Sequence, residues 1–228
     1  MRAKLSVLLI SICLAGCARQ YATPIIENKA VSSASLQPTL ESNHAAIVLV
    51  TYYILDTASG RSGVYYSSGL VVGSYAVVSD GISSEYFKPI VIRGVTVRSA
   101  AGEWSEIPAL VSARLPGDFG LTLLKTNSQL PVKPIVFGKN TPGKKIKGYS
   151  FGSDDGLVLP NVRKVAPAFA TVHWNGKRCD PAEGPGSGIK SNTWIIFDMK
   201  HRLLCFVFLP SQEVEIFLRD NQVSIFTD

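Results

Sequence analysis

One serine lies in a glycine-rich, turn-forming segment that could present it as a nucleophile. It is Ser187, within residues 184–188, which read Gly-Pro-Gly-Ser-Gly. A serine hydroxyl is a weak nucleophile unless a neighbouring base takes its proton and a third group orients that base. The histidines that could act as this base are far apart along the chain, at His44, His173 and His201. The sequence therefore provides a possible nucleophile without a base at a recognisable spacing.

Cys17 is a second residue with a chemical role, because of what precedes it. Two basic residues, Arg2 and Lys4, are followed by an apolar run from Leu5 to Leu14. This order is typical of a secretory signal, and the run is shorter than the roughly 20 residues of a membrane-spanning helix. The Leu-Ala-Gly-Cys sequence that ends at Cys17 resembles the lipobox of bacterial lipoproteins. The resemblance implies cleavage before Cys17 and a lipid on its thiol; an ordinary signal peptide with an incidental cysteine is the alternative.

The same resemblance implies a location in the cell. Ala18, rather than aspartate, follows Cys17. By the sorting rules of enterobacterial lipoproteins, this implies anchoring in the outer membrane, facing the periplasm. Disulfides form and persist in such an oxidising compartment. We therefore expect Cys179 and Cys205 to pair, with two buried thiols as the alternative.

Charge and composition argue against two other classes of partner. The formal net charge of +6 falls to +4 after cleavage, because two of the basic residues lie in the signal (6 − 2). The sequence contains no long run of like charge and no arginine-rich helix, so we do not expect a nucleic-acid partner. The histidines and cysteines show no metal-ligand spacing. We therefore expect neither a metal nor another cofactor.

Short β-strands are the elements that would position these residues. Residues 17–44 are rich in Ser, Ala, Pro, Asn and Gln and have no apolar period, which predicts a flexible tether behind the lipidated cysteine. In residues 45–228, β-branched and aromatic runs recur about every 8 to 12 residues, which is typical of an all-β sandwich or barrel. A helical period is visible only over Ser211–Phe217. The chain thus divides into a signal peptide (1–16), a tether (17–44) and one all-β domain (45–228).

Two pairs of adjacent tyrosines fall within these predicted strands. They are Tyr52 with Tyr53 and Tyr65 with Tyr66. Neighbouring residues of a strand point to opposite faces of the sheet. We therefore expect one tyrosine of each pair to lie in the core and the other to lie outside it.

The order of four segments is similar to that in bacterial trypsin-like peptidases of the HtrA kind. In that family they are the strand pair before the catalytic histidine, the strand after the aspartate, the hairpin before a Gly-Tyr/Asn-Pro turn, and the hairpin after the nucleophile. The resemblance extends over residues 45–218 and implies two packed six-stranded β-barrels of the chymotrypsin type. The matching segments here are Ser67–Ser79, Phe119–Lys125, Val136–Gly152 and Ile196–Val207.

The catalytic triad of that family does not carry over to this sequence. Its histidine position falls at Ile82 and its aspartate position at Gly120. Its nucleophile falls at Asn192 by counting back from the last hairpin, or at Ser187 if an insertion is allowed. Isoleucine accepts no proton and glycine orients no base, so the resemblance implies a peptidase fold with an incomplete triad.

Three functions follow from these features. The first is a lipid-anchored, catalytically inactive peptidase-like module that binds a protein or peptide in the cell envelope. The second is a divergent serine peptidase that uses Ser187 with a relocated base. The third is an all-β envelope lipoprotein with a structural role. The first explains both Ile82 and Gly120, and it is our leading hypothesis.

Overall fold

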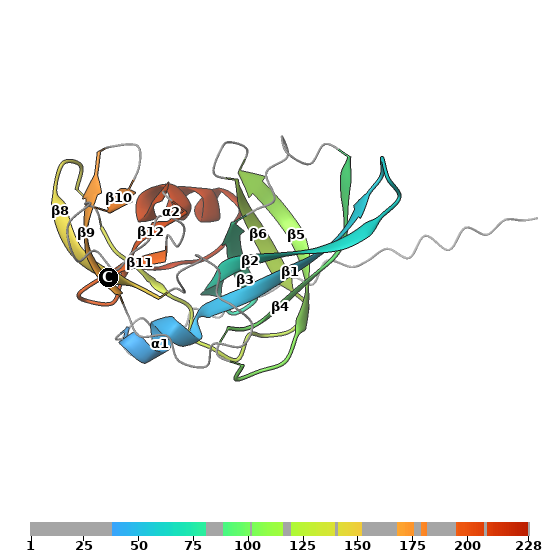
Figure 1. Cartoon of the computed structure of the whole chain (residues 1–228). Helices are drawn as coiled ribbons and strands as arrows, with labels where there is room; N and C mark the ends of the chain where they lie inside the picture. Colours follow the sequence, from blue (N-terminus) through green and yellow to red (C-terminus); the bar gives the residue numbers. More distant parts are fainter. Residues whose placement is uncertain are drawn as a thin grey trace, which may run out of the picture. The chain divides into compact units, whose positions relative to one another are not determined.

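Strands dominate the protein, as the spacing of its apolar runs predicts (Figure 1). The structure is a computed structural model. It describes residues 38–80, 89–100, 102–115, 120–139, 141–151, 168–175, 179–181, 195–207 and 209–227.

The first six strands form a closed antiparallel barrel with the order β1-β2-β3-β6-β5-β4. Strand β1 closes the barrel because it pairs with β2 on one side and with β4 on the other. One barrel of the two that the sequence predicts is therefore confirmed. The strands are β1 (Ile47–Asp56), β2 (Ser62–Gly73), β3 (Ala76–Asp80), β4 (Ile90–Ser99), β5 (Ile107–Leu115) and β6 (Leu121–Thr126).

Alternation along the barrel strands separates the core from the outer surface. Tyr52 is fully buried, whereas its neighbour Tyr53 is 39% exposed. Tyr65 is partly buried against the core, and Tyr66 is 47% exposed. The predicted division of each tyrosine pair between core and surface is confirmed. It follows from the period of two that a pleated strand imposes on its side chains.

Gly69 lies in a crowded part of the barrel interior. A Cβ atom at this position would lie 2.9 Å from Val50 Cγ2 and 2.9 Å from Val77 Cγ1. It would also lie 3.1 Å from Val48 Cγ2. All three valines are fully buried, and β-branched side chains have few alternative rotamers. The close approach of β1, β2 and β3 therefore requires glycine here.

The second half of the domain forms an open mixed sheet, not the second six-stranded barrel that the sequence predicts. Its order is β10-β9-β8-β11-β12-β7-β14, and β13 pairs with β12. Strand β7 pairs in parallel with both β12 and β14. The bounds are β7 (Val136–Phe137), β8 (Lys145–Ser150), β9 (Ala168–Trp174), β10 (Cys179–Pro181), β11 (Ile195–Asp198), β12 (Leu203–Phe206), β13 (Leu209–Pro210) and β14 (Phe226–Thr227).

The prediction of a second barrel is wrong because hydrogen bonds do not close this sheet within the described residues. A barrel requires every strand to pair on both sides with a consistent stagger. Here the end strands β10 and β14 each pair with a single neighbour. Strands β7, β13 and β14 have only two residues each, which is too short to continue a tilted ladder around a barrel.

A disulfide joins the two ends of the curled part of this sheet. Cys179 on β10 and Cys205 on β12 are bonded, which is the pair that the sequence favours. Four strand spacings separate β10 from β12 in the sheet order, which is about 19 Å in a flat sheet. Their Cα atoms are 6.2 Å apart. The sheet therefore curls until β10 meets β12, and a covalent bond holds the contact.

The inside of this curled sheet is a small apolar cluster of its own. Both cysteines are fully buried in it. The remaining members come from four neighbouring strands, so each strand contributes to one shared interior. They are Ile146, Val172, Ile196 and Leu204.

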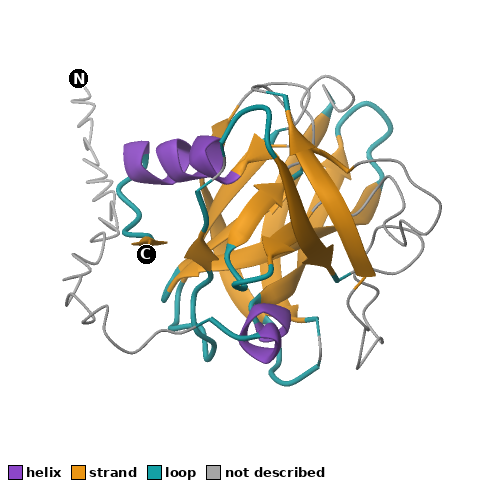
Figure 2. Ribbon diagram, turned by 90° about the vertical axis from the view of Figure 1, so that its left-hand side faces the viewer, coloured by secondary structure: helices purple, strands orange, loops and turns teal. Residues whose placement is uncertain are grey.

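Two helices complete the described structure and lie outside the strands (Figure 2). Helix α2 (Ser211–Asp220) covers the helical period predicted over Ser211–Phe217. Helix α1 (Leu40–Ala45) falls within the last residues assigned to the tether. It begins with a capping box, in which the Thr39 hydroxyl accepts a hydrogen bond from Ser42 N at 3.1 Å. Neither described helix is long and apolar enough to cross a membrane.

Substituting Gly69→Ala should destabilise the barrel by about 1–3 kcal/mol, because the added methyl group overpacks against rigid valines. Gly63→Ala on the same strand is the matched control. A Cβ at Gly63 would meet Ile54 Cγ1 at 3.6 Å, an ordinary contact. Urea unfolding of both variants measures the difference. Equal midpoints for the two variants would contradict this account of the barrel interior.

Removing the disulfide in a Cys179→Ser/Cys205→Ser variant should lower the free energy of unfolding by about 3 kcal/mol. The bridge closes a loop between residues 26 positions apart, and it restricts the unfolded chain accordingly. The measurement is urea unfolding with and without reductant. Reductant should shift the wild-type midpoint and leave the variant unchanged. A reduced wild type with two free thiols and an unshifted midpoint would refute the prediction.

Candidate functional site

The strand register places the end of β3 beside the start of β6. In trypsin-like peptidases, the segments next to these two strand ends carry the catalytic histidine and aspartate. Asp80, the last residue of β3, pairs with Leu121, the first residue of β6. Gly120 directly precedes β6 and is partly exposed. Ile82 lies two residues beyond Asp80 in the sequence, outside the described residues. The β3–β6 end of the barrel is therefore the candidate site.

The remaining predicted site positions lie outside the described part of the chain. These are the two alternative nucleophile positions and the cysteine of the lipobox. Their assignments stay predictions. They are Ser187, Asn192 and Cys17.

A chain of buried hydroxyl groups fixes the main chain at this end of the barrel. Tyr52 donates a hydrogen bond to Ser79 Oγ at 3.2 Å. Ser79 Oγ donates to the carbonyl of Asp80 at 3.1 Å, and Ser67 Oγ donates to the same carbonyl at 2.6 Å. The two serine oxygens are 3.1 Å apart. Three strands thus hold the backbone of Asp80 in one position.

Burial has a large effect on the phenol at the start of this chain. Burial raises the pKa of Tyr52 to about 12, and hydrogen bonds with Ser79 and Thr122 oppose the shift. Both serines of the chain are buried, at 3% and 0% exposure for Ser67 and Ser79. These hydroxyls donate to main-chain carbonyls and do not reach solvent. They stabilise the barrel end and are not available as nucleophiles.

The Asp80 carboxylate is the exceptional group at this site. Burial raises its pKa to about 6, from an ordinary value of 3.8. Within the described residues, no hydrogen bond or ion pair reaches the carboxylate. Its negative charge in turn raises the pKa of Tyr65, after the larger effect of that residue's burial. An unpaired, partly buried carboxylate can bind a cationic or hydrogen-bond-donating group, or accept a proton near neutral pH.

Asp80 is a site residue that the sequence does not indicate. The available signal was an acidic residue two positions before Ile82. An aspartate at the end of a strand is usually a turn residue, and nothing in the sequence indicates that this one is buried without a partner. Its environment arises from the register of β3 against β6, which only the three-dimensional structure provides.

No protein-family model matches the chain, and no curated protein matches it. The likeness to trypsin-like peptidases therefore rests on the closed barrel, the order of the sequence motifs and the position of the β3–β6 end.

In the described residues, none of the three histidines contacts the β3–β6 end, where a base would be needed. His44, in α1, lies with its ring 5.0 Å from that of Phe151, and burial lowers its pKa while Glu103 opposes the shift. His173, in β9, pairs with Lys145 and Asp180 of the second sheet.

The third histidine, His201, lies at the turn between β11 and β12 and is bonded to Tyr149. Asn43 Nδ2 donates to the Tyr149 hydroxyl at 3.0 Å, so the Tyr149 proton points to His201 Nδ1, 2.8 Å away. Asn43 Nδ2 also donates to the carbonyl of His201 at 2.7 Å. This histidine is therefore committed to the contact between α1 and the second sheet.

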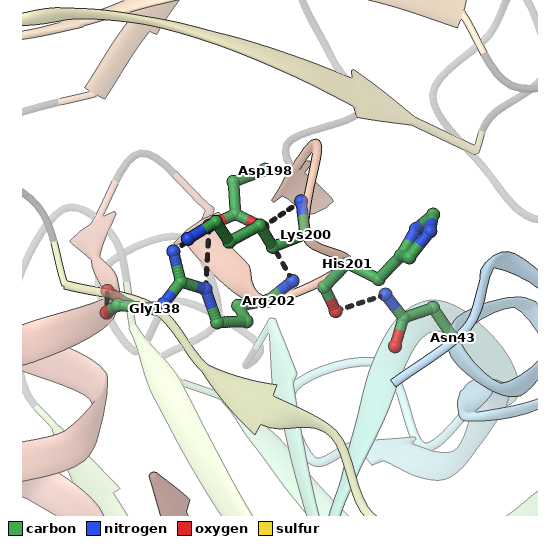
Figure 3. A network of polar contacts seen from close by, with 7 residues as sticks. Asn43, Gly138, Asp198, Lys200, His201 and Arg202 are labelled. Carbon is green, nitrogen blue, oxygen red and sulfur yellow. Dashed lines mark hydrogen bonds and ion pairs between the residues drawn. The ribbon is translucent and has the colours of Figure 1, made fainter. Parts of the chain in front are cut away.

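The turn that carries His201 is rigid for local reasons (Figure 3). The Asp198 carboxylate accepts hydrogen bonds from Lys200 N at 2.8 Å and Arg202 N at 2.9 Å. It also forms an ion pair with the Arg202 guanidinium at 2.7 Å. His201 has a φ of 63°, a left-handed conformation that is uncommon outside glycine. The network around Asp198 and Asn43 holds the residue there, which indicates a structural role.

Metal chemistry has no candidate site in the described ranges, where no group of three or more His, Cys, Asp or Glu side chains is placed to hold a metal ion.

The variant Asp80→Asn should stabilise the protein at pH 7.5 by about 2 kcal/mol. A carboxyl whose pKa is raised on folding disfavours the folded state once it ionises. Wild-type stability, relative to the amide variant, should therefore fall as pH rises from about 4 to about 6 and stay level above that range. Thermal unfolding from pH 4 to pH 8 measures the difference between the two proteins.

Asp56→Asn is the matched control on the same barrel. Hydrogen bonds from Ser59 and from the Ala58 amide lower the pKa of this exposed aspartate. Asp56 therefore adds stability that is lost as pH falls, so its substitution should destabilise the protein at pH 7.5. An Asp80→Asn variant that behaves like Asp56→Asn would show that Asp80 has a partner.

Proposed function

We propose that this chain is a membrane-anchored, non-catalytic relative of trypsin-like peptidases that binds a peptide or protein segment in the bacterial cell envelope. The observation that carries the proposal is the β3–β6 register at one end of a closed six-stranded barrel. In the family that the motifs resemble, this end holds the catalytic histidine and aspartate. Here the matching residues are Ile82 and Gly120.

Loss of both residues removes the chemistry of the triad. A serine at position 187 or an asparagine at position 192 would lack a base held by an orienting carboxylate. The contacts of His44 and His201 are with Phe151, Tyr149 and Asn43, not with β3 or β6. Because the triad acts as a unit, the residual catalysis from backbone donors alone is small. Binding without turnover is the remaining activity of such a site.

The groups at the barrel end suit recognition. Three strands hold the main chain rigidly at Asp80, and its carboxylate is free to accept hydrogen bonds. Rigid groups that need no reordering lose little entropy when a ligand binds. A peptide or protein segment with a basic or hydrogen-bond-donating side chain fits such a carboxylate. The proposal includes neither a cofactor nor a nucleic-acid partner.

The membrane anchor belongs to the same proposal. The Leu-Ala-Gly-Cys motif at Cys17 supports lipidation and an outer-membrane position facing the periplasm. The disulfide between Cys179 and Cys205 supports export, because such bonds persist mainly in oxidising compartments.

Site-specific photocrosslinking in living cells tests the binding function. A benzoylphenylalanine at position 120 should give one discrete protein adduct, since it lies at the β3–β6 end. The matched control is position 110: Leu110 is 76% exposed and pairs with Lys125, at the opposite end of the β5–β6 pair. Adducts at 110 and 120 in equal yield, or at neither, would contradict a partner at this end. An all-β lipoprotein with a purely structural role would then be favoured.

A fluorophosphonate probe separates the binding module from a divergent peptidase. We expect no labelling of the purified chain. If labelling occurs, mass spectrometry locates the modified residue. Labelling at Ser187 that a Ser187→Ala variant abolishes would establish a base near that serine. The chain would then be a serine peptidase, and the non-catalytic proposal would be abandoned.

A further inference from the structure

Exposed apolar side chains gather on the outer face of strands β2, β1 and β4. Eight large apolar or aromatic residues of the described ranges are exposed, and four of them lie here, whereas the others occur singly on other elements. Single exposed apolar residues are normal on a protein surface, but a group of them indicates an interaction site. The four are Tyr53, Val64, Tyr66 and Val91, which are between 39% and 47% exposed.

The strand register places these four side chains on one face. Tyr53 of β1 pairs with Val64 of β2, and Tyr66 follows Val64 by two residues. Val91 of β4 pairs with Leu55, which follows Tyr53 by two residues. Directly paired residues, and residues two apart on a strand, share a face of the sheet. The four side chains therefore form one surface, which we call the hairpin face.

The opposite side of the same strand segments belongs to the core. Ile54, Tyr65 and Ile92 alternate with the residues of the hairpin face and pack against the core cluster. The hairpin face therefore points away from the barrel interior. It lies beyond the end of the β2–β3 pairing, which stops at Gly69, and Figure 1 shows the β1–β2 hairpin projecting from the barrel there.

Two exposed arginines flank the hairpin face. Arg61 lies in the turn between β1 and β2, and Arg93 lies on β4. The acidic residue of the turn, Asp56, uses its carboxylate locally, because it accepts hydrogen bonds from Ala58 N at 2.9 Å and from Ser59 Oγ at 2.5 Å. Tyrosines and aliphatic side chains beside exposed cations are typical of surfaces that lie at a membrane interface.

We propose that the hairpin face contacts the surface of an anionic lipid bilayer. The inference rests on the membrane anchor of the proposed function, which brings lipid to the domain at a high effective concentration. Tyrosine rings place apolar carbon atoms in the interface and keep their hydroxyl groups in water. The two valines add apolar area, and the two arginines attract anionic headgroups. The contact would orient the barrel relative to the membrane.

The length of the chain before the domain permits this contact. Twenty-one residues separate Cys17 from Pro38, the first described residue (38 − 17). Fully extended, such a segment spans about 70 Å. The domain begins near the start of β1, and the hairpin face lies near the other end of this ten-residue strand, about 33 Å away. The anchor and the hairpin face can therefore reach the same bilayer.

The experiment uses the full lipidated chain in vesicles of phosphatidylethanolamine and phosphatidylglycerol. Val64→Cys introduces a thiol that is labelled with the environment-sensitive dye nitrobenzoxadiazole. This thiol alone should react, because the signal peptide is removed, Cys17 carries lipid, and Cys179 and Cys205 are bonded. The control label is placed with Leu110→Cys, since Leu110 on β5 is 76% exposed and lies outside the hairpin face.

We expect the label at position 64 to emit at shorter wavelength and to lose its quenching by iodide in these vesicles, since it enters the bilayer interface. The label at position 110 should emit as in water and stay quenched. Both effects at position 64 should weaken when phosphatidylcholine replaces phosphatidylglycerol, because the arginines then have no anionic headgroups to attract.

Substitutions beside the label test which side chains make the contact. Arg61→Gln and Arg93→Gln should each lower the ratio of protected to quenched label about fivefold. Tyr66→Ser should lower it as well, because it removes an interfacial ring. Phe169→Ser removes an exposed aromatic side chain of β9 and should leave the ratio unchanged. Equal effects of the Tyr66 and Phe169 substitutions would overturn the proposal.

Flotation of the same vesicles separates this inference from the proposed function. A chain that does not float with the vesicles lacks the anchor, and both the anchor and the contact are then overturned. A chain that floats while iodide quenches both labels equally keeps the anchor and overturns the contact. Protection of position 64 in detergent alone that increases with protein concentration would assign the face to a second copy of the chain and would also overturn the proposal.

Discussion

A curled β-sheet has two edges whose backbone groups need partners, and β1 removes both edges in the first half of this domain. It pairs along almost its whole length with β2 on one side and β4 on the other. The closed ladder fixes the register of every other barrel strand, including β3 against β6. The position of Asp80 beside Leu121 depends on this closure. This closure also requires glycine at position 69, because no side chain fits among the surrounding valines.

A rigid barrel can hold charged groups in environments that they would otherwise leave. An isolated aspartate can turn toward water, but strands β2 and β3 hold the main-chain carbonyl of Asp80 through Ser67 and Ser79. Each unpaired charge lowers stability, and most proteins keep such groups only where they serve a purpose. The unpaired Asp80 carboxylate is therefore the strongest indication of binding in the described structure.

Much of the barrel could be predicted from the sequence, because its strands obey a period of two. The tyrosine pairs divide between core and surface as expected, and α2 covers its predicted helical period. Strand lengths are less evident from the sequence, because Gly69 and Gly94 lie inside β2 and β4 and do not end them. Helix α1 was missed because six residues are too few for a visible period, although its Thr39 capping box was present in the sequence. The environment of Asp80 arises from register between distant strands, which no local pattern encodes.

The open second sheet shows why motif order could not establish closure. Of the two segments that resemble the family's hairpins, Ile196–Val207 does pair, as β11 with β12. In Val136–Gly152, β7 pairs with β12 and β14 instead of with β8, and β7, β13 and β14 are too short to complete a ladder. Cys179 and Cys205 join the curled sheet where hydrogen bonds do not, so a covalent bond takes the place of a ladder in this half. The first barrel has no such dependence, since backbone pairing alone closes it. The β3–β6 end lies on that barrel, and its geometry therefore does not require the disulfide.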